Sequence, residues 1–328
     1  MIVYDKDLPP LLSDYGIQVP MLKGRAERVH EEIIKEFSER VVFQGLIPDL
    51  SRNDFKLAHT EGFLQRCEDE GDKVIQETFE LINSDGSYHR YNPDMAKYPL
   101  NKLVDSFWRS AALSFKSVEL AGETGFSYFL GGGYHHSMSE RGRGFCLFND
   151  IVIAARKYQK SHPGLIWVID IDAHKGCGTA EMTQADPSIV TMSVHMKSGW
   201  PLDSERTDSS GKLHPWFIPS DIDVEISRNE EDIYLEKLRD GLARLGQFQL
   251  PEMCIVVDGS DPYKGDALPS ADLLQLSKEQ CLERNQVVYN FLKEKNIPQA
   301  YFMSGGYGDK NWEIHYQFLR SVLKKENS

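Results

Sequence analysis

The chain has 328 residues, 41% of them hydrophobic, and a formal net charge of −13. This length is enough for a sizeable core, in one large domain or two small ones. The acidity argues against sequence-independent binding to nucleic acid, because phosphates are neutralised by Lys and Arg.

Cysteine usage and the first residues favour a reducing compartment. The chain has five cysteines, an odd number, and no Cys-x-x-Cys pair. We therefore expect neither a disulfide framework nor a structural zinc knuckle. Residues 1–16 lack a basic region followed by a long apolar run, and no apolar stretch reaches about 18 residues. We therefore expect no signal peptide, no membrane span and a cytoplasmic location.

Helical patterns dominate the first 125 residues, for example at 25–40 and 101–121, and from Phe126 onward short apolar runs alternate with helical patterns. The predicted strands are 126–130, 165–171, 189–195, 253–257 and 300–303, and the predicted helices between them are 150–159, 230–245 and 278–294. Ser277 and Gln280 form a capping-box pattern at the start of the last of these helices.

This alternation predicts an α/β fold with a central, mostly parallel β-sheet flanked by helices. No Pro-, Gly- or Ser-rich linker divides the chain, so residues 1–328 are predicted to form a single domain. In open sheets of this kind, sites form at the carboxyl ends of strands. Each unusual polar cluster of this sequence lies at such an end.

The first cluster is Asp170, Asp172 and His174, at the end of the predicted strand 165–171. Residues spaced by two share one face of a strand. Ionisable groups buried together are costly unless a cation or hydrogen bonds compensate them, and Asp with His suits Zn²⁺. The alternative is a loop that begins at Asp172 and exposes its side chains, and the motif alone leaves both interpretations open.

A second cluster follows the predicted strand 253–257 and offers Asp258, Asp261 and Asp266, although an ordinary turn has the same composition. Two further clusters also have ordinary structural explanations. His135 and His136 follow three glycines, and tandem histidines are usually surface residues. Tyr307 follows two glycines, and a tyrosine in such a turn is more often structural than catalytic.

The clusters are more informative together. Two Asp and one His hold Zn²⁺ and leave its fourth position open. A histidine pair manages protons, and a tyrosine hydroxyl donates to a developing oxyanion. The combination predicts metal-assisted hydrolysis of an acyl bond.

At these residues the sequence resembles the zinc-dependent histone deacetylase family, on the arginase–deacetylase fold. The motifs that carry the resemblance occur in the family's order: RAERVH (25–30), HTEGFL (59–64), GGGYHHSMSERGRGFCLFND (131–150), DIDAHKGCG (170–178), GSDPYKGD (259–266) and SGGY (304–307). The Asp-Ala-His form and the Ser-Gly-Gly-Tyr ending resemble class IV and related bacterial deacetylase-like amidohydrolases.

The resemblance implies the following chemistry for named residues. The zinc ligands are Asp172, His174 and Asp261, with Fe²⁺ as an alternative metal. His135 and His136 handle protons, with His136 as general base, and Tyr307 is the oxyanion donor. Asp170 supports His135 and helps bind a structural K⁺, to which Ser193 adds an oxygen.

The resemblance also implies an acyl-lysine tunnel. Gly144 and Phe145 contribute to one wall and Trp200 to the other, and Arg25 lies below the metal near an acetate exit. Leu268 falls where acetylpolyamine amidohydrolases carry an acidic residue, which favours an acylated lysine in a protein or peptide over an acylated small amine.

The sequence departs from the family at Cys177, where an Asp or Asn usually supports the second histidine. A thiol is a weak hydrogen-bond partner, so His136 is expected to be less basic.

We therefore predict zinc-dependent hydrolysis of N-acyl lysine side chains. Three alternatives remain: an acetylpolyamine amidohydrolase, a degenerate acyl-lysine-binding module, and a binuclear manganese ureohydrolase. The last needs bridging carboxylates, and no carboxylate follows His174 directly.

Overall fold

The computed structural model describes residues 1–19, 24–202, 206–207, 209–214 and 216–326. Within these residues seven strands form one sheet, in the order β1-β2-β7-β6-β3-β4-β5. Every neighbouring pair is parallel. The strands are β1 (Ile2–Val3), β2 (Phe126–Phe129), β3 (Ile166–Asp170), β4 (Ile189–Met196), β5 (Ile222–Ile226), β6 (Met253–Val257) and β7 (Gln299–Phe302).

The longer helices are α1 (Arg25–Phe37), α5 (Lys102–Thr124), α6 (Asp150–Gln159), α8 (Tyr234–Leu245), α9 (Lys278–Glu294) and α10 (Asn311–Glu326). Shorter helices are α2 (Arg52–Phe55), α3 (Glu61–Asp69), α4 (Gly71–Thr78) and α7 (Cys177–Thr183). No helix of the described residues is both long enough and apolar enough to span a bilayer.

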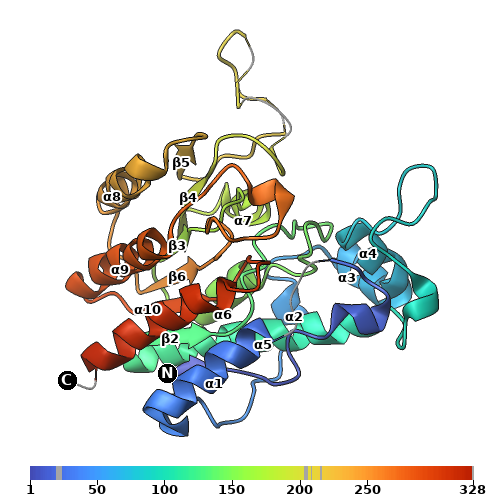
Figure 1. Ribbon diagram of the computed structural model, residues 1–328, viewed down its shortest axis with the longest axis horizontal. Helices are drawn as coiled ribbons and strands as arrows, with labels where there is room; N and C mark the ends of the chain where they lie inside the picture. The colour runs from blue at the N-terminus through green and yellow to red at the C-terminus, as the bar shows by residue number, and fades with distance from the viewer. Residues whose placement is uncertain (20–23, 203–205, 208, 215, 327–328) are drawn as a thin grey trace.

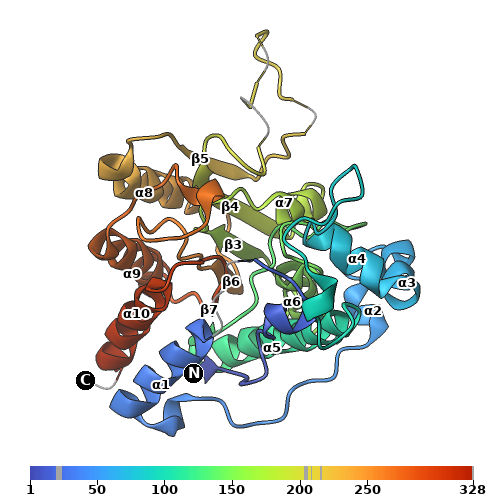
Figure 2. The ribbon, with the colours of Figure 1, turned by 45° about the vertical axis from the view of Figure 1, so that its right-hand side comes forward.

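Helices cover both faces of the sheet (Figures 1 and 2). Val168 of β3 packs into the core that α5 and α6 help to form. Its neighbours Trp167 and Ile169 pack into the opposite core, to which α1, α8, α9 and α10 contribute. Because successive side chains of a strand point to opposite faces, a sheet buried on both sides reads as an unbroken apolar run. This explains the apolar character of the predicted strands.

The predicted α/β fold with a parallel sheet is confirmed, and several elements have the predicted bounds. Helices α6 and α9 and strand β6 match residue for residue, and the capping box of Ser277 and Gln280 is present. The helix predicted at 230–245 begins later, at Tyr234, after a 3₁₀ turn at Glu231–Ile233. β1, β5, α7 and α10 were not predicted from the sequence.

Candidate active site

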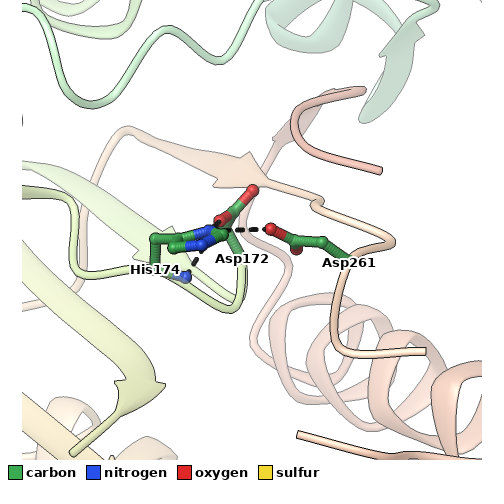
Figure 3. A group of neighbouring side chains, drawn as sticks. All are labelled: Asp172, His174 and Asp261. Carbon is green, nitrogen blue, oxygen red and sulfur yellow. Dashed lines mark hydrogen bonds and ion pairs between the residues drawn. The ribbon is translucent and has the colours of Figure 1, made fainter. Parts of the chain in front are cut away.

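Three ionisable side chains from two loops converge at the carboxyl edge of the sheet. Asp172 and His174 lie in the loop after β3, and Asp261 lies in the loop after β6. One potential ligand atom from each lies within 4.8 Å of the others, and Figure 3 shows the side chains pointing toward one another. His174 Nδ1 is 3.2 Å from Asp172 Oδ1 and 2.9 Å from Asp261 Oδ2. The fold thus brings the three predicted metal ligands together.

The strand that leads to the first of these loops is shorter than predicted. β3 ends at Asp170, so Asp172 and His174 do not alternate on a strand face, and the period-two argument is wrong for them. Side-chain acceptors fold the loop instead: Asp170 Oδ1 accepts from Asp172 N at 3.2 Å, and Asp172 Oδ1 accepts from His174 N at 3.0 Å. The alternative of exposed side chains is also wrong, because Asp172 is 2% and His174 3% exposed.

The charges of this cluster fit a bound cation. Burial and repulsion from the Asp172 carboxylate raise the pKa of Asp261 to about 7. Asp261 Oδ2 is buried and accepts no hydrogen bond within the described residues, although it lies 2.9 Å from His174 Nδ1. A cation held by the three groups would satisfy this oxygen and remove the repulsion. Two Asp and one His are a donor set that suits Zn²⁺.

The turn after β7 closes over the same cluster. Gly305 N donates to Asp172 Oδ2 at 3.0 Å, and a Cβ at Gly305 would lie 2.5 Å from that oxygen. A side chain at this position would displace the carboxylate, which explains the need for glycine. Arg25 holds the turn from α1, donating to the carbonyls of Gly305 at 2.7 Å and Gly306 at 2.9 Å.

His135 is held by Asp170, the carboxylate that the family resemblance assigned to it. Its Nδ1 donates to Asp170 Oδ2 at 2.6 Å. Burial alone lowers the pKa of His135, but the charges of Asp170 and Asp172 outweigh it and raise this pKa to about 8. Asp170 pairs in the sheet with Ser193, whose buried Oγ has no hydrogen-bond partner among the described residues. An oxygen of this kind beside a carboxylate fits the K⁺ site that the resemblance implies.

His136 lies against the residue at which the sequence departs from the family. Its Nδ1 is 3.6 Å from Cys177 Sγ, and Arg143 Nη1 approaches the same sulfur at 3.9 Å. Burial and the neighbouring charges of His135 and His174 hold the pKa of His136 well below its ordinary value. The lowered pKa favours the neutral imidazole, which is the form that a general base needs, and makes it weakly basic.

A cavity of about 380 Å³ adjoins the metal cluster. Its lining includes Gly144, Phe145, Trp200 and Leu268, the four residues predicted to bind substrate, together with His135, His136, Asp172, His174, Tyr307 and Arg25. Gly144 has a φ of 55°, and a Cβ there would lie 2.2 Å from the Trp200 ring. The wall therefore requires glycine at this position. The Phe145 ring lies 6.2 Å from that of Tyr307.

Tyr307 is positioned through its backbone by Asp266. The Tyr307 amide donates to Asp266 Oδ2 at 2.7 Å, and the Leu268 amide donates to Asp266 Oδ1 at 2.7 Å. One carboxylate therefore sets two positions of the cavity wall. Burial and the charges of Asp261 and Asp172 raise the pKa of Tyr307 well above its ordinary value, so its hydroxyl stays protonated and available as a donor.

Asp150 is a residue of the site to which the sequence analysis gave no role. It accepts from Gly133 N at 2.9 Å and from Tyr134 N at 2.7 Å, which fixes the turn before His135. Its signal was its place at the end of the long motif block 131–150.

Comparisons with known proteins agree with this geometry. Histone deacetylase 2 of Arabidopsis thaliana is 30% identical over 207 residues, 63% of this chain and 50% of that protein. Histone deacetylase Clr6 of Schizosaccharomyces pombe is 25% identical over 340 residues, 98% of this chain and 76% of that protein. The solved structure of a histone deacetylase homologue in complex with SAHA superposes with a TM-score of 0.73 at 16% identity, covering 98% of this chain and 83% of that one.

Fold and site together define an α/β protein with three potential metal ligands buried at the carboxyl ends of a parallel sheet. The chain belongs to the histone deacetylase family, because the family model for the histone deacetylase domain matches residues 19–321. The chain spans about half the length of the Arabidopsis relative that it matches. The resemblance to class IV stays a prediction, since the matches do not single out a class.

Proposed function

We propose that the chain is a zinc-dependent deacylase that hydrolyses N-acyl lysine side chains of a protein or peptide. One observation carries the proposal: His136, Tyr307 and the candidate metal ligands Asp172 and His174 all line the same cavity. Hydrolysis of an amide requires a base, an oxyanion donor and an open metal position that face the same cavity.

Each group has a defined part in the proposed reaction. Zn²⁺, or Fe²⁺ in its place, would polarise the acyl carbonyl and acidify a water when bound. Because Nδ1 of His136 faces Cys177, its Nε2 is the nitrogen that accepts the water proton. The Tyr307 hydroxyl donates to the carbonyl oxygen as it gains charge. A protonated histidine then passes its proton to the departing amine, with Asp170 supporting the charge on His135.

A binuclear manganese ureohydrolase fits the structure less well. The group of potential metal ligands found in the described residues has three side chains, and Lys175 follows His174 where a bridging carboxylate is needed.

The proposal also includes a structural K⁺ near Asp170 and a cytoplasmic location. All five cysteines are free and buried.

Two charged side chains of the cavity wall bear on the class of substrate. Glu80 and Arg90 both line the cavity, at backbone φ values of 55° and 52°. Strained backbone of this kind gathers at binding sites. Glu80 would attract the distal ammonium of an acylated polyamine, whereas Arg90 would repel it and Leu268 offers it no charge. With a polypeptide substrate, both Glu80 and Arg90 would find hydrogen-bond partners, because the backbone presents donors and acceptors on either side of the acyl-lysine.

The proposal predicts a higher kcat/KM for an acetyl-lysine peptide than for N-acetylputrescine, measured with added Zn²⁺. Arg90→Glu should raise kcat/KM for N-acetylputrescine by up to about 30-fold, because it replaces a repulsive charge pair by an attractive one and each exposed pair contributes roughly 0–1 kcal/mol. Arg239→Glu, at an exposed position on α8, is the control and should leave the ratio of the two substrates unchanged. Preference for the amine would favour the polyamine alternative, and peptide binding without turnover of either substrate would favour the binding module.

A pH–rate profile tests the contact of Cys177 with His136. Cys177→Asp should raise the pKa of His136, because a nearby carboxylate stabilises the imidazolium. Since the base must be unprotonated, the acidic limb of kcat/KM should move to higher pH, while Cys177→Ser, which adds no charge, should leave it in place. An unmoved limb in folded Cys177→Asp with its metal bound would show that Cys177 does not adjoin the base.

A further inference from the structure

A single buried arginine joins the two loops that carry the candidate metal ligands. Arg284, in α9, has no exposed surface. Its Nη1 donates to the carbonyl of Ile171 at 3.0 Å, directly before Asp172 in the first loop. Its Nη2 donates to Asp258 Oδ1 at 2.9 Å, at the start of the loop that leads to Asp261. One planar group thus spans both loops.

The Asp258 carboxylate is held by several donors at once. Asn285 Nδ2 lies 3.0 Å from each of its oxygens, and the Tyr128 hydroxyl donates to Oδ2 at 2.6 Å. His315 Nδ1 lies 3.3 Å from the same oxygen. Asp258 and all four partners, Arg284 included, are 0% exposed. A buried charge pair that is fully hydrogen-bonded resists displacement, because no water is present to replace a lost partner.

Direct contacts link the same two loops on the side of the ligands. Ala173 N donates to Asp261 Oδ1 at 3.0 Å, and Ile171 N donates to Val257 O at 3.0 Å. The backbone of Ile171 therefore hydrogen-bonds through its N–H to the end of β6 and through its carbonyl to Arg284. A change at Arg284 would alter how the two loops face each other.

We propose that Arg284 is a positioning residue for the metal centre, whose guanidinium sets the separation of the two ligand loops and thereby their metal affinity. The proposal rests on metal binding by Asp172, His174 and Asp261 in the proposed function. Lysine is not equivalent at this position, because its ammonium is a point charge, whereas the rigid fork of arginine donates in fixed directions to two acceptors at once.

The test is the dissociation constant for Zn²⁺, measured on metal-stripped protein by competition with a chromogenic chelator. Arg284→Lys keeps the charge that Asp258 needs, and it should weaken Zn²⁺ binding by about tenfold or more, the usual effect of losing a group that orients a ligand. The control is Arg156→Lys. Arg156 also donates to two carbonyls, those of Leu57 and Met182, and pairs with Asp186, but it touches neither ligand loop.

The dissociation constant for Zn²⁺ distinguishes a positioning role of Arg284 from a general contribution of Arg284 to the stability of the fold. A folded Arg284→Lys variant whose dissociation constant matches that of Arg156→Lys would overturn the proposal, even if its apo Tm had fallen. If Arg284→Lys does not fold, the double variant Arg284→Gln, Asp258→Asn decides: it removes the guanidinium that spans the two loops and leaves no buried charge unpaired. Weaker Zn²⁺ binding in that variant supports the proposal, and unchanged binding contradicts it. Wild-type protein that binds no Zn²⁺ would overturn the proposed function itself. This result differs from a failure of the Arg284 proposal alone, in which the wild type binds Zn²⁺ and the variant binds it equally well.

Discussion

Replacing Asp172 or His174 by Ala is expected to abolish both zinc binding and hydrolysis. These residues and Asp261 form the one group of side chains among the described residues that could together hold a metal ion. A site with three protein ligands has no redundancy, so the loss of one should leave the metal unbound at ordinary concentrations. Metal analysis of the purified variants should show a fall from about one equivalent of zinc to almost none.

The control for this experiment is Asp240→Ala, because Asp240 is exposed on α8. It should retain zinc and activity, and circular dichroism should show native secondary structure in all three variants. Undiminished zinc in folded Asp172→Ala and His174→Ala would refute the assignment of the metal site.

Tyr307→Phe is expected to lower kcat by about 10²–10³-fold with zinc retained. The substitution removes one hydroxyl and keeps the ring that faces Phe145. Loss of a single oxyanion donor has this cost because the donor acts in a site from which water is excluded, where the loss corresponds to about 2.7–4 kcal/mol of transition-state stabilisation. Single-turnover kinetics on an acetyl-lysine peptide would measure the chemical step.

Tyr301→Phe is the matched control for that prediction. Tyr301 also carries a buried hydroxyl, which donates to Gln299 at 3.2 Å within β7, but it does not line the cavity. Its loss should leave kcat within about threefold of wild type, because only a neutral hydrogen bond is removed. A drop of less than about threefold in Tyr307→Phe itself would mean that another group is the oxyanion donor, given the usual cost of losing one.

Elements with strong local signals were predictable from the sequence. The start of α9 followed from its capping box, in which Ser277 and Gln280 satisfy each other's backbone amides. The start of α6 is fixed in a similar way, since Asn149 accepts from Val152 N at 3.1 Å. Alternation of such helices with apolar strands was enough to indicate the parallel sheet and the edge at which the polar clusters meet.

Other features could not be predicted because they are very short or depend on partners far away in the sequence. β1 has two residues, which cannot show a period, and it pairs with β2 far along the chain. The loop of Asp172 and His174 is shaped by side-chain acceptors that no hydrophobic pattern reveals. Arg284 reaches Ile171 across 113 positions of sequence, so nothing near either residue indicates their contact.

Zinc dependence can be measured by reconstituting metal-stripped protein with Zn²⁺ and following hydrolysis of an acetyl-lysine peptide at each addition. Activity should be absent from the stripped protein, rise in proportion to the zinc added, and level off at about one equivalent per chain, as a single three-ligand site requires. Protein that binds one equivalent of Zn²⁺ and still fails to hydrolyse the peptide, or hydrolysis that persists in the fully stripped protein, would refute a zinc-dependent deacylase.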